Sequence, residues 1–315
     1  MTITDRALLP VLDLGDYLAG VPGAREAAAA ELREALLHVG FFAMVDHGVD
    51  WRQVEGIYEQ AARFHAVPLE AKTSIEMTAR RMGYLQLGKG YSRASSLDEL
   101  KKPNMNAAFF MSKEPHPDPA RNQFPPGLPG FREACAAYFD RMEALGKALL
   151  PLYAVALGLA PDWFDDKFDP PQATLRLSHY PPVEYEEGQF GIGAHTDAGF
   201  MTLLPSNTAR GLYIRPAGGE WTEIDQPPES FIVNSGDSLR RWTNDRFLST
   251  SHRARNHTGA DRYAIPFFFD PNGSTMIECL PTCSGPGDPP RHEPITYREY
   301  LIWFMQANYE QTRQS

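Results

Sequence analysis

The periodicity of the chain changes near Ala173, and this change constrains the fold more than any other feature of the 315-residue sequence. From there on, short runs of β-forming residues recur about every ten residues, separated by Gly, Pro, Asn and Asp. The eight runs are Thr174–Tyr180, Gln189–Thr196, Phe200–Pro205, Leu212–Arg215, Phe231–Asn234, Leu248–Ala254, Tyr263–Phe269 and Thr275–Glu278. Strands of this number and spacing predict a sandwich or barrel of the jelly-roll type.

The first half of the chain is expected to be mainly helical, with short β-type runs at Leu8–Leu14 and Gly40–Val49. Apolar spacing and helix-ending residues predict helices over Gly23–Val39, Trp51–Ala66, Leu69–Thr78, Phe131–Leu159 and, at the end of the chain, Tyr297–Gln311. Pro151 should kink or divide the long helix, because proline lacks the backbone N–H. The Gly- and Pro-rich stretch between Arg80 and Pro129 reads as a long loop, although apolar residues at Met105, Phe109–Met111 and Phe124 suggest that parts of it pack. Its segment with Met105, Asn106, Phe109 and Phe110 is a candidate lid.

We expect one α+β domain over residues 1–315 with a mainly β core. Residues 1–125 would form the N-terminal helical and loop region. Residues 126–315 would hold the long helix, the jelly-roll barrel (a double-stranded β-helix) and the C-terminal helix.

Composition excludes several classes of protein. The formal net charge of −10 argues against a nucleic-acid binder, and three cysteines are too few for a disulfide framework. The first residues lack the pattern of a signal peptide, and the longest apolar run, Ala148–Ala160, is too short to cross a bilayer. We therefore expect a cytoplasmic protein with a small-molecule partner and no membrane or nucleic-acid partner. The sequence does not indicate an oligomeric state.

His195 and Asp197 lie two residues apart at the end of the second β-type run. In an extended chain their side chains point to the same face. They can share a divalent metal ion if a third ligand comes from elsewhere, and two His with one carboxylate is the ligand set of non-haem Fe(II) oxygenases. The alternative is a turn capped by Asp197. Among the remaining histidines, strand context favours His252, because about four intervening strands would return the chain to the same end of a barrel.

A second candidate group follows, because Arg262, Ala264, Pro266 and Phe268 share one face of the next run. A buried arginine needs an anion, since an unpaired buried charge is costly. Its partner could be a protein carboxylate such as Asp237, or the carboxylate of a small molecule held by two hydrogen bonds. The metal ligands nearby favour the small molecule.

A series of short motifs runs through almost the whole chain. They are Leu9-Pro-Val-Leu-Asp-Leu14, Gly40–Val49, Asn122–Pro125, Leu128–Arg132, Leu175–Pro182, His195-Thr-Asp197, Gly211-Leu-Tyr213, Asn234-Ser-Gly-Asp237, Trp242-Thr-Asn244 and Ser251-His-Arg253. In this order they resemble the iron(II)/2-oxoglutarate-dependent oxygenases of the isopenicillin N synthase-like superfamily. The resemblance implies that the chain uses Fe(II), 2-oxoglutarate and O2, and that His195, Asp197 and His252 ligate the iron.

The same resemblance implies that Arg262 pairs with the distal carboxylate of 2-oxoglutarate, assisted by the hydroxyl of Tyr180. One departure stands out, because the family's Arg-x-Ser reads Arg262-Tyr-Ala264 here and lacks the serine hydroxyl. Members that halogenate lack the carboxylate ligand, so Asp197 favours hydroxylation or desaturation. Gly211-Leu-Tyr213, Asn234 and Asp237 are interpreted as residues that hold the fold.

Substrate residues are less strongly indicated. Arg176 and Ser178 share strand parity with Tyr180 and are expected to face the barrel interior, where Arg176 would bind an anionic group or, alternatively, pair with a surface carboxylate. Phe268 is a candidate apolar wall, and Asn106 and Phe110 are candidates from the long loop. The predicted function is oxidation of an unactivated C–H bond of a small molecule, in secondary metabolism, with release of succinate and CO2. Alternatives are an iron oxidase of the same fold that uses no 2-oxoglutarate, for which Ala264 speaks, and a non-redox metal-binding protein or zinc hydrolase.

Overall fold

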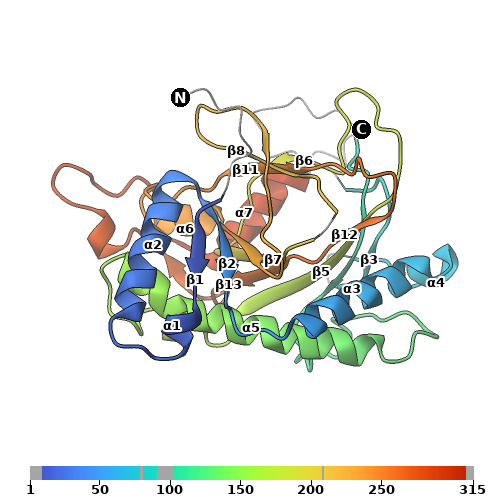
Figure 1. The fold of residues 1–315 in the computed structure, drawn as a ribbon, viewed down its shortest axis with the longest axis horizontal. Coiled ribbons are helices and arrows are strands. Elements are labelled where there is room, and N and C mark those ends of the chain that lie inside the picture. Colours follow the sequence, from blue (N-terminus) through green and yellow to red (C-terminus); the bar gives the residue numbers. More distant parts are fainter. Residues whose placement is uncertain (1–8, 79–80, 91–101, 208, 310–315) are drawn as a thin grey trace.

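Two β-sheets face each other, and a layer of helices covers the outer face of the larger one (Figure 1). The computed structural model describes residues 9–78, 81–90, 102–207 and 209–309. In these residues the larger sheet has the order β1 (Val11–Asp13), β2 (Phe41–Val45), β10 (Phe231–Ser235), β7 (Met201–Pro205), β13 (Phe267–Asp270), β5 (Gln172–Tyr180), β4 (Ala107–Met111) and β3 (Tyr84–Leu85), and β12 (Arg262–Ala264) also pairs with β5. The smaller sheet has the order β6 (Ile192–His195), β11 (Ser251–Ala254), β8 (Leu212–Arg215) and β9 (Thr222–Glu223).

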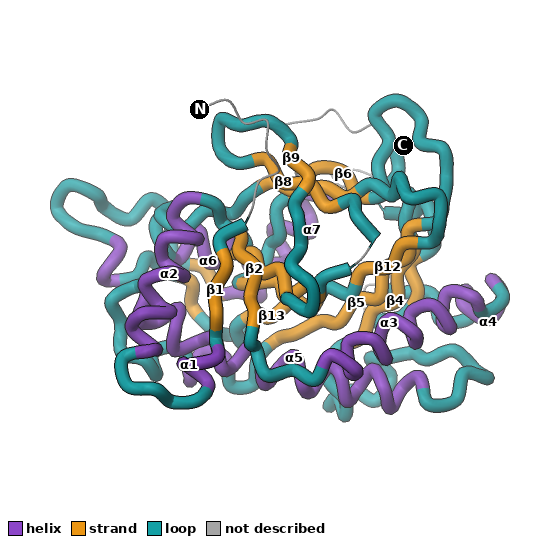
Figure 2. The backbone as a smooth tube through the Cα atoms, viewed as in Figure 1, coloured by secondary structure: helices purple, strands orange, loops and turns teal. Residues whose placement is uncertain are grey.

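The connections between the sheets are those of a jelly roll. Successive strands from β5 to β8 alternate between the larger and the smaller sheet, and β10, β11 and β12 do so again. The expected double-stranded β-helix is therefore confirmed, and Figure 2 shows the smaller sheet lying above the larger one. A further pair, β14 (Met276–Ile277) and β15 (Ile295–Thr296), lies outside both sheets.

Three helices form the covering layer, namely α2 (Ala24–His38), α3 (Trp51–Ala66) and α5 (Phe131–Ala156). The shorter helices are α1 (Gly15–Leu18), α4 (Leu69–Thr73) and α6 (Asp237–Trp242), and α7 (Tyr297–Tyr309) follows β15. The expected helices therefore exist, although α4 is shorter than predicted and the expected end at Gln311 lies outside the described residues. Within the described residues, no helix combines the length and apolarity needed to cross a membrane.

Helix α5 contacts α2, α3 and β13 and runs along the bottom of the molecule as drawn in Figure 1. Gly146 of α5 lies so close to Phe269 of β13 that a Cβ atom at position 146 would be 2.8 Å from the ring. Of the two outcomes expected at Pro151, a kink or a division, the division is wrong, because α5 continues through this residue. The neighbouring Leu149, Leu150 and Leu152 are buried, so packing outweighs the hydrogen bond that proline removes.

The stretch between Arg80 and Pro129 is not the continuous loop that its Gly and Pro content predicts. It contains β3 and β4, and β4 pairs with β5 along its whole length. Phe109 and Met111 are fully buried in the core, so the proposed lid is wrong for this segment. The strand escaped prediction because it is short and because turn-forming residues surround it. Residues 91–101 of this stretch lie outside the described part of the chain.

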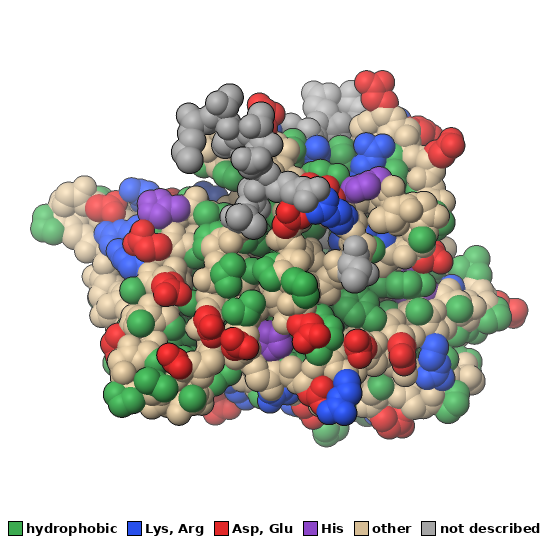
Figure 3. Space-filling model, viewed as in Figure 1, with side chains coloured by type: hydrophobic (Ala, Val, Ile, Leu, Met, Phe, Trp, Pro, Cys, Tyr) green, Lys and Arg blue, Asp and Glu red, His purple; other side chains and the backbone are tan. Residues whose placement is uncertain are grey.

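The strands of the jelly roll follow seven of the eight predicted runs. The prediction is wrong for the eighth run, Thr275–Glu278, because its strand β14 pairs with β15 outside both sheets. The run Tyr263–Phe269 is split into β12 and β13, because Pro266 has no N–H to donate to the ladder, although its carbonyl oxygen accepts from the amide of Arg176 at 3.0 Å. The short elements β9 and α6 had no clear sequence signal. Acidic side chains are scattered among basic ones on the face shown in Figure 3, in keeping with the net charge of −10.

Candidate metal centre and pocket

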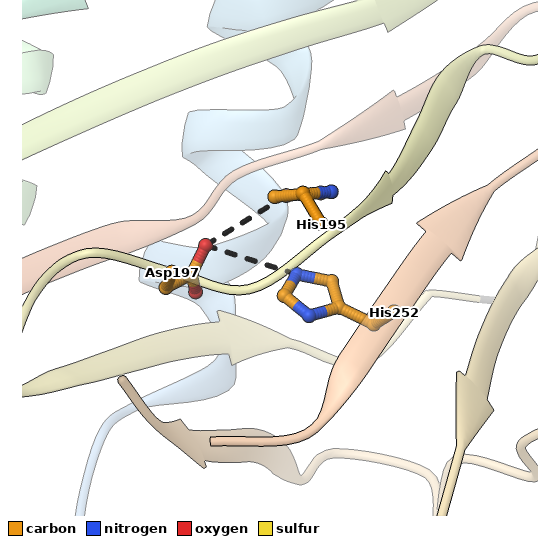
Figure 4. Close-up of side chains that lie close together, drawn as sticks. All are labelled: His195, Asp197 and His252. Carbon is orange, nitrogen blue, oxygen red and sulfur yellow. Dashed lines mark ion pairs between the residues drawn. The ribbon is translucent and has the colours of Figure 1, made fainter. Parts of the chain in front are cut away.

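The smaller sheet and the loop that follows β6 bring His195, Asp197 and His252 together (Figure 4). His195 ends β6 and is the direct cross-strand partner of His252 on β11. Asp197 lies just beyond the end of β6. Its Oδ1 atom is 3.7 Å from Nε2 of each histidine, and the three candidate ligand atoms all lie within 4.8 Å of one another. Strand pairing thus produces the grouping that sequence parity predicts.

Backbone carbonyl groups orient both imidazoles. Nδ1 of His195 lies 2.9 Å from the carbonyl oxygen of Gly193, and Nδ1 of His252 lies 3.3 Å from that of Thr250. Each Nδ1 therefore carries the proton that it donates, which leaves Nε2 of the ring facing Asp197. This is the usual way in which a protein fixes the tautomer of a metal-binding histidine.

The carboxylate of Asp197 is held equally firmly. Its Oδ2 atom accepts hydrogen bonds from the hydroxyl of Thr202 at 2.5 Å and from the side-chain amide of Asn234 at 2.8 Å. Because Oδ2 is occupied in this way, Oδ1 faces the two imidazoles. The polar atoms of the metal centre are thus arranged by the protein alone.

The segment Asn234-Ser-Gly-Asp237 supports the loop that carries Asp197. The amide of Asp237 donates to the carbonyl oxygen of Asp197 at 2.7 Å, and its carboxylate accepts from the hydroxyl of Thr196 at 2.9 Å. Gly236 packs so closely that a Cβ atom would lie 2.3 Å from the carbonyl oxygen of Gly199. Interpreting this segment as holding the fold is therefore correct, and what it holds is the loop that carries the candidate ligand Asp197.

Burial sets the protonation of these groups. It lowers the pKa of His195 to about 4, with a further contribution from His252, so this imidazole is neutral near pH 7. Burial alone would raise the pKa of Asp197, but the neighbouring imidazoles and its two hydrogen bonds outweigh that effect and lower it. Neutral imidazole and ionised carboxylate are the protonation states in which these side chains bind a metal.

Two imidazole nitrogens and one carboxylate oxygen, grouped on one side, fit a divalent iron ion with coordination positions left open. A zinc ion can use the same donor types. Within the described residues, this is the one group of three or more His, Cys, Asp or Glu side chains close enough together to share a metal ion.

Arg262 lies at the other end of the same pocket, on β12. It is 2% exposed, its guanidinium lies 4.9 Å from the ring centre of Tyr180, and Nε donates to the carbonyl oxygen of Ala209 at 3.3 Å. Nη1 has no hydrogen-bond partner among the described residues. Asp237, the protein carboxylate considered as its partner, is engaged with Thr196 instead. A buried guanidinium with a free N–H group fits the carboxylate of a bound small molecule.

Four of the other predicted pocket residues line this space, whereas Asn106 and Phe110 do not line it and contact Arg176 instead. Arg176, Ser178 and Tyr180 project from β5 into the pocket, and Phe268 lines it from β13. Arg176 donates to the side-chain oxygen of Asn106 at 3.0 Å. Its guanidinium also lies 5.2 Å from the ring centre of Phe110 on β4.

Sequence reasoning missed some residues of the site. Thr202 has a direct role in orienting Asp197, and its only sequence signal is strand parity with Leu204, which also lines the pocket. Arg253, next to His252, lines the pocket as well, and its guanidinium lies 4.2 Å from the ring centre of Trp221. That contact joins β11 to the residue before β9, and no local sequence pattern brings these two places together.

A jelly roll with a two-histidine, one-carboxylate centre at one end of its barrel and a buried arginine beyond it has the architecture of a non-haem iron oxygenase. Comparison with known proteins agrees. Residues 171–271 match the model of the 2OG-Fe(II) oxygenase superfamily, and residues 9–127 match that of the non-haem dioxygenase N-terminal region, described from morphine synthesis.

Individual relatives cover nearly the whole chain. The 2-oxoglutarate-Fe(II) type oxidoreductase hxnY of Emericella nidulans is 31% identical, over 95% of this chain and 90% of its own. The crystal structure of a full-length Neurospora crassa protein in complex with alpha-KG and thymine is 25% identical and superposes with a TM-score of 0.86 over 98% of both chains. That of JOX2 with 2OG, Fe and JA is also 25% identical, with a TM-score of 0.79 over 96% of this chain and 87% of that one.

The chain belongs to the 2OG-Fe(II) oxygenase superfamily. It is a 2-oxoglutarate-dependent dioxygenase that uses iron and O2, as the resemblance of its motifs implies. The alternative of an oxidase without 2-oxoglutarate, raised by Ala264, is not favoured, because the relatives are 2-oxoglutarate-dependent enzymes.

Proposed function

We propose that His195, Asp197 and His252 ligate the iron, that Arg262 binds the distal carboxylate of 2-oxoglutarate, and that the enzyme hydroxylates or desaturates a small molecule. The observation that carries this proposal is the spatial grouping of the three candidate ligands, with Oδ1 of Asp197 3.7 Å from both Nε2 atoms. The free Nη1 of Arg262 in the same pocket supports the second part.

In this proposal the protein contributes position and charge. Iron and 2-oxoglutarate, when bound, would supply the chemistry that oxidises an unactivated C–H bond. Succinate and CO2 are released in that reaction. His195 and Asp197 present donors in the correct protonation state, so little reorganisation is needed when the metal binds. Arg262, together with the Tyr180 hydroxyl, would fix the far end of the co-substrate and thereby its orientation. Phe268 and the apolar residues of the pocket exclude water.

We further propose that Arg176, with Asn106 and Phe110, contacts the substrate. Nε of Arg176 is buried without a partner among the described residues, and none of the ion pairs found there involves this side chain, which speaks against a structural role. A substrate with an anionic or carbonyl oxygen would satisfy that N–H group. Thymine and JA, the compounds found with the two similar structures, both carry such oxygens and are suitable first probes.

The activity can be tested by anaerobic reconstitution with Fe(II) followed by addition of O2. We expect succinate to form only when 2-oxoglutarate is present, and its rate to rise with the correct substrate. Oxidation of a substrate without consumption of 2-oxoglutarate would contradict the proposal and restore the oxidase alternative. The oxidised product, identified by mass, distinguishes hydroxylation from desaturation.

The role of Arg176 can be tested with Arg176→Ala. We expect the KM for the substrate to rise about tenfold or more, since a hydrogen bond to a charged group is lost. The matched control is Arg63→Ala on α3, outside the pocket. Unchanged KM values for both substrate and 2-oxoglutarate would refute the role. Organisation as one domain over residues 1–315, location in the cytoplasm and a part in secondary metabolism remain predictions.

A further inference from the structure

Ser178 carries a buried hydroxyl group that the residues around it leave free. Its side chain is 0% exposed, and Oγ has no hydrogen-bond partner among the described residues. A buried polar group without a partner is unusual, because it loses its hydrogen bonds to water without replacing them. Ser178 also lines the pocket that contains Arg262, so a ligand in that pocket can reach it.

Strand pairing fixes where this hydroxyl lies relative to Arg262. On the β5–β12 pair, Tyr180 is opposite Arg262 and Ser178 is opposite Ala264. Side chains directly opposite each other have Cβ atoms about 5 Å apart, and diagonal neighbours such as Ser178 and Arg262 about 7–8 Å. A carboxylate between two such side chains can accept hydrogen bonds from both.

The surroundings of Ser178 leave room for such a ligand. Its neighbours across the two adjacent strands are Ala264 on β12 and Ala108 on β4, both with only a methyl group. Ala264 has no hydroxyl, so on this pair of strands the donor next to Arg262 can come only from the β5 side. The serine that the family has at position 264 is thus absent, and the residue directly opposite that position, Ser178, carries a hydroxyl without a partner among the described residues.

We propose that Ser178 donates a hydrogen bond to the distal carboxylate of 2-oxoglutarate and so supplies, from β5, the hydroxyl that position 264 lacks. This inference rests on the proposed role of Arg262. One carboxylate oxygen then accepts a hydrogen bond from Nη1 of Arg262, and the other accepts one from Oγ of Ser178. Both donors, which are unpartnered in the protein alone, are satisfied by the same ligand.

The test moves the hydroxyl between the two strands. The protein is loaded with Fe(II) without O2 and titrated with 2-oxoglutarate, and binding is followed by the visible charge-transfer absorption of the iron chelate. We expect Ser178→Ala to raise the Kd about tenfold or more. Ala264→Ser alone should change the Kd less than about threefold, because the carboxylate already has its donor. The double variant Ser178→Ala/Ala264→Ser should recover most of the lost affinity.

Two controls separate this contact from a general effect. A 2-oxo acid without a distal carboxylate, such as 2-oxopentanoate, should bind the wild type and Ser178→Ala equally well. Ser238→Ala is the matched control, because Ser238 is also fully buried with an unpartnered hydroxyl but does not line the pocket. If Ser178→Ala is too unstable to titrate, Ser178→Cys keeps the shape and offers only a weak donor, and it should also weaken binding.

The outcomes are distinct. An unchanged Kd for 2-oxoglutarate in Ser178→Ala would overturn the inference, as would a rise in substrate KM without any effect on 2-oxoglutarate. Failure of Ala264→Ser to recover affinity in the double variant would also overturn it. If the wild type itself gives no 2-oxoglutarate-dependent absorption, the proposed function fails first, and this inference fails with it.

Discussion

The end of the pocket with the candidate metal ligands and the end with Arg262 differ in how their polar atoms are hydrogen-bonded. At the metal end, the ligand side chains have their remaining polar atoms bonded within the protein: each histidine Nδ1 to a carbonyl group, and Oδ2 of Asp197 to Thr202 and Asn234. At the arginine end, Nη1 of Arg262 and Oγ of Ser178 have no partner. Within the described residues, the polar atoms at one end are bonded to the protein, whereas two buried donors at the other end have no partner.

This difference follows from what each end must recognise. A metal ion needs several donors placed within tenths of an ångström, so their orientation has to be fixed in advance. An organic carboxylate brings its own acceptor oxygens, so the protein needs only buried donors that it does not satisfy itself. The metal end should therefore be sensitive to changes in its supporting hydrogen bonds, whereas the arginine end should be sensitive mainly to loss of its donors.

The largest expected effect is at the metal end. Asp197→Ala should reduce Fe(II) affinity by at least about 100-fold and abolish succinate formation, because one of three ligands is lost. Fe(II) titration and an activity assay measure this, with Asp140→Ala on the exposed side of α5 as the control. Normal iron affinity in Asp197→Ala would mean that the grouping is not the iron site.

The next largest effect is at the arginine end. Arg262→Leu should weaken 2-oxoglutarate binding about 100-fold or more, since charge-assisted hydrogen bonds to the distal carboxylate are lost. Fe(II) affinity should stay the same, because the ligand side chains do not depend on this residue. Equal losses of iron and 2-oxoglutarate would show that the two ends are not independent.

A smaller effect tests whether the metal end depends on its supporting bonds. Thr202→Val keeps the shape of the side chain but removes the donor to Oδ2 of Asp197. We expect about a tenfold loss of Fe(II) affinity, as is typical when a group that orients a ligand is removed. Thr222→Val on β9 is the control. An unchanged iron affinity would imply that Asn234 alone orients the carboxylate.

The last prediction concerns stability rather than binding and involves Asp270, whose carboxylate accepts from the amide of Phe200 near the loop that carries Asp197. Burial raises its pKa from 3.8 to about 7. Between about pH 4 and 7 the native state therefore holds a proton on Asp270 that the unfolded chain has released. The contribution of this group to the free energy of unfolding is complete below about pH 4 and is lost as the pH rises through 7.

Asp270→Asn removes this titration and keeps an oxygen that can accept from Phe200. The free energy of unfolding of the metal-free wild type should fall relative to the variant between pH 4 and 7, by at most about 1.4 kcal/mol per pH unit. Denaturant unfolding at several pH values measures the difference. A difference that does not change with pH would show that Asp270 titrates normally.

Much of this protein was predictable from local pattern. The alternation of apolar residues from Ala173 onward fixes the strands, because a buried face selects every second side chain. The same parity places His195, Arg176 and Ser178 toward the pocket, and the resemblance of the motifs implies the family. The short strand β4 was missed, because five residues between glycines and prolines give too weak a pattern against the loop signal.

Only the tertiary structure decided which distant residues meet. That Thr202 and Asn234 share one oxygen of Asp197, and that Ser178 stands opposite Ala264, depends on the register between strands that lie far apart in the chain. Local sequence sets the direction in which a side chain points, but register is set by the packing of both sheets at once. The sequence by itself therefore determined the barrel and the candidate metal ligands as a group, and the structure decided how those side chains are oriented and which buried donors have no partner among the described residues.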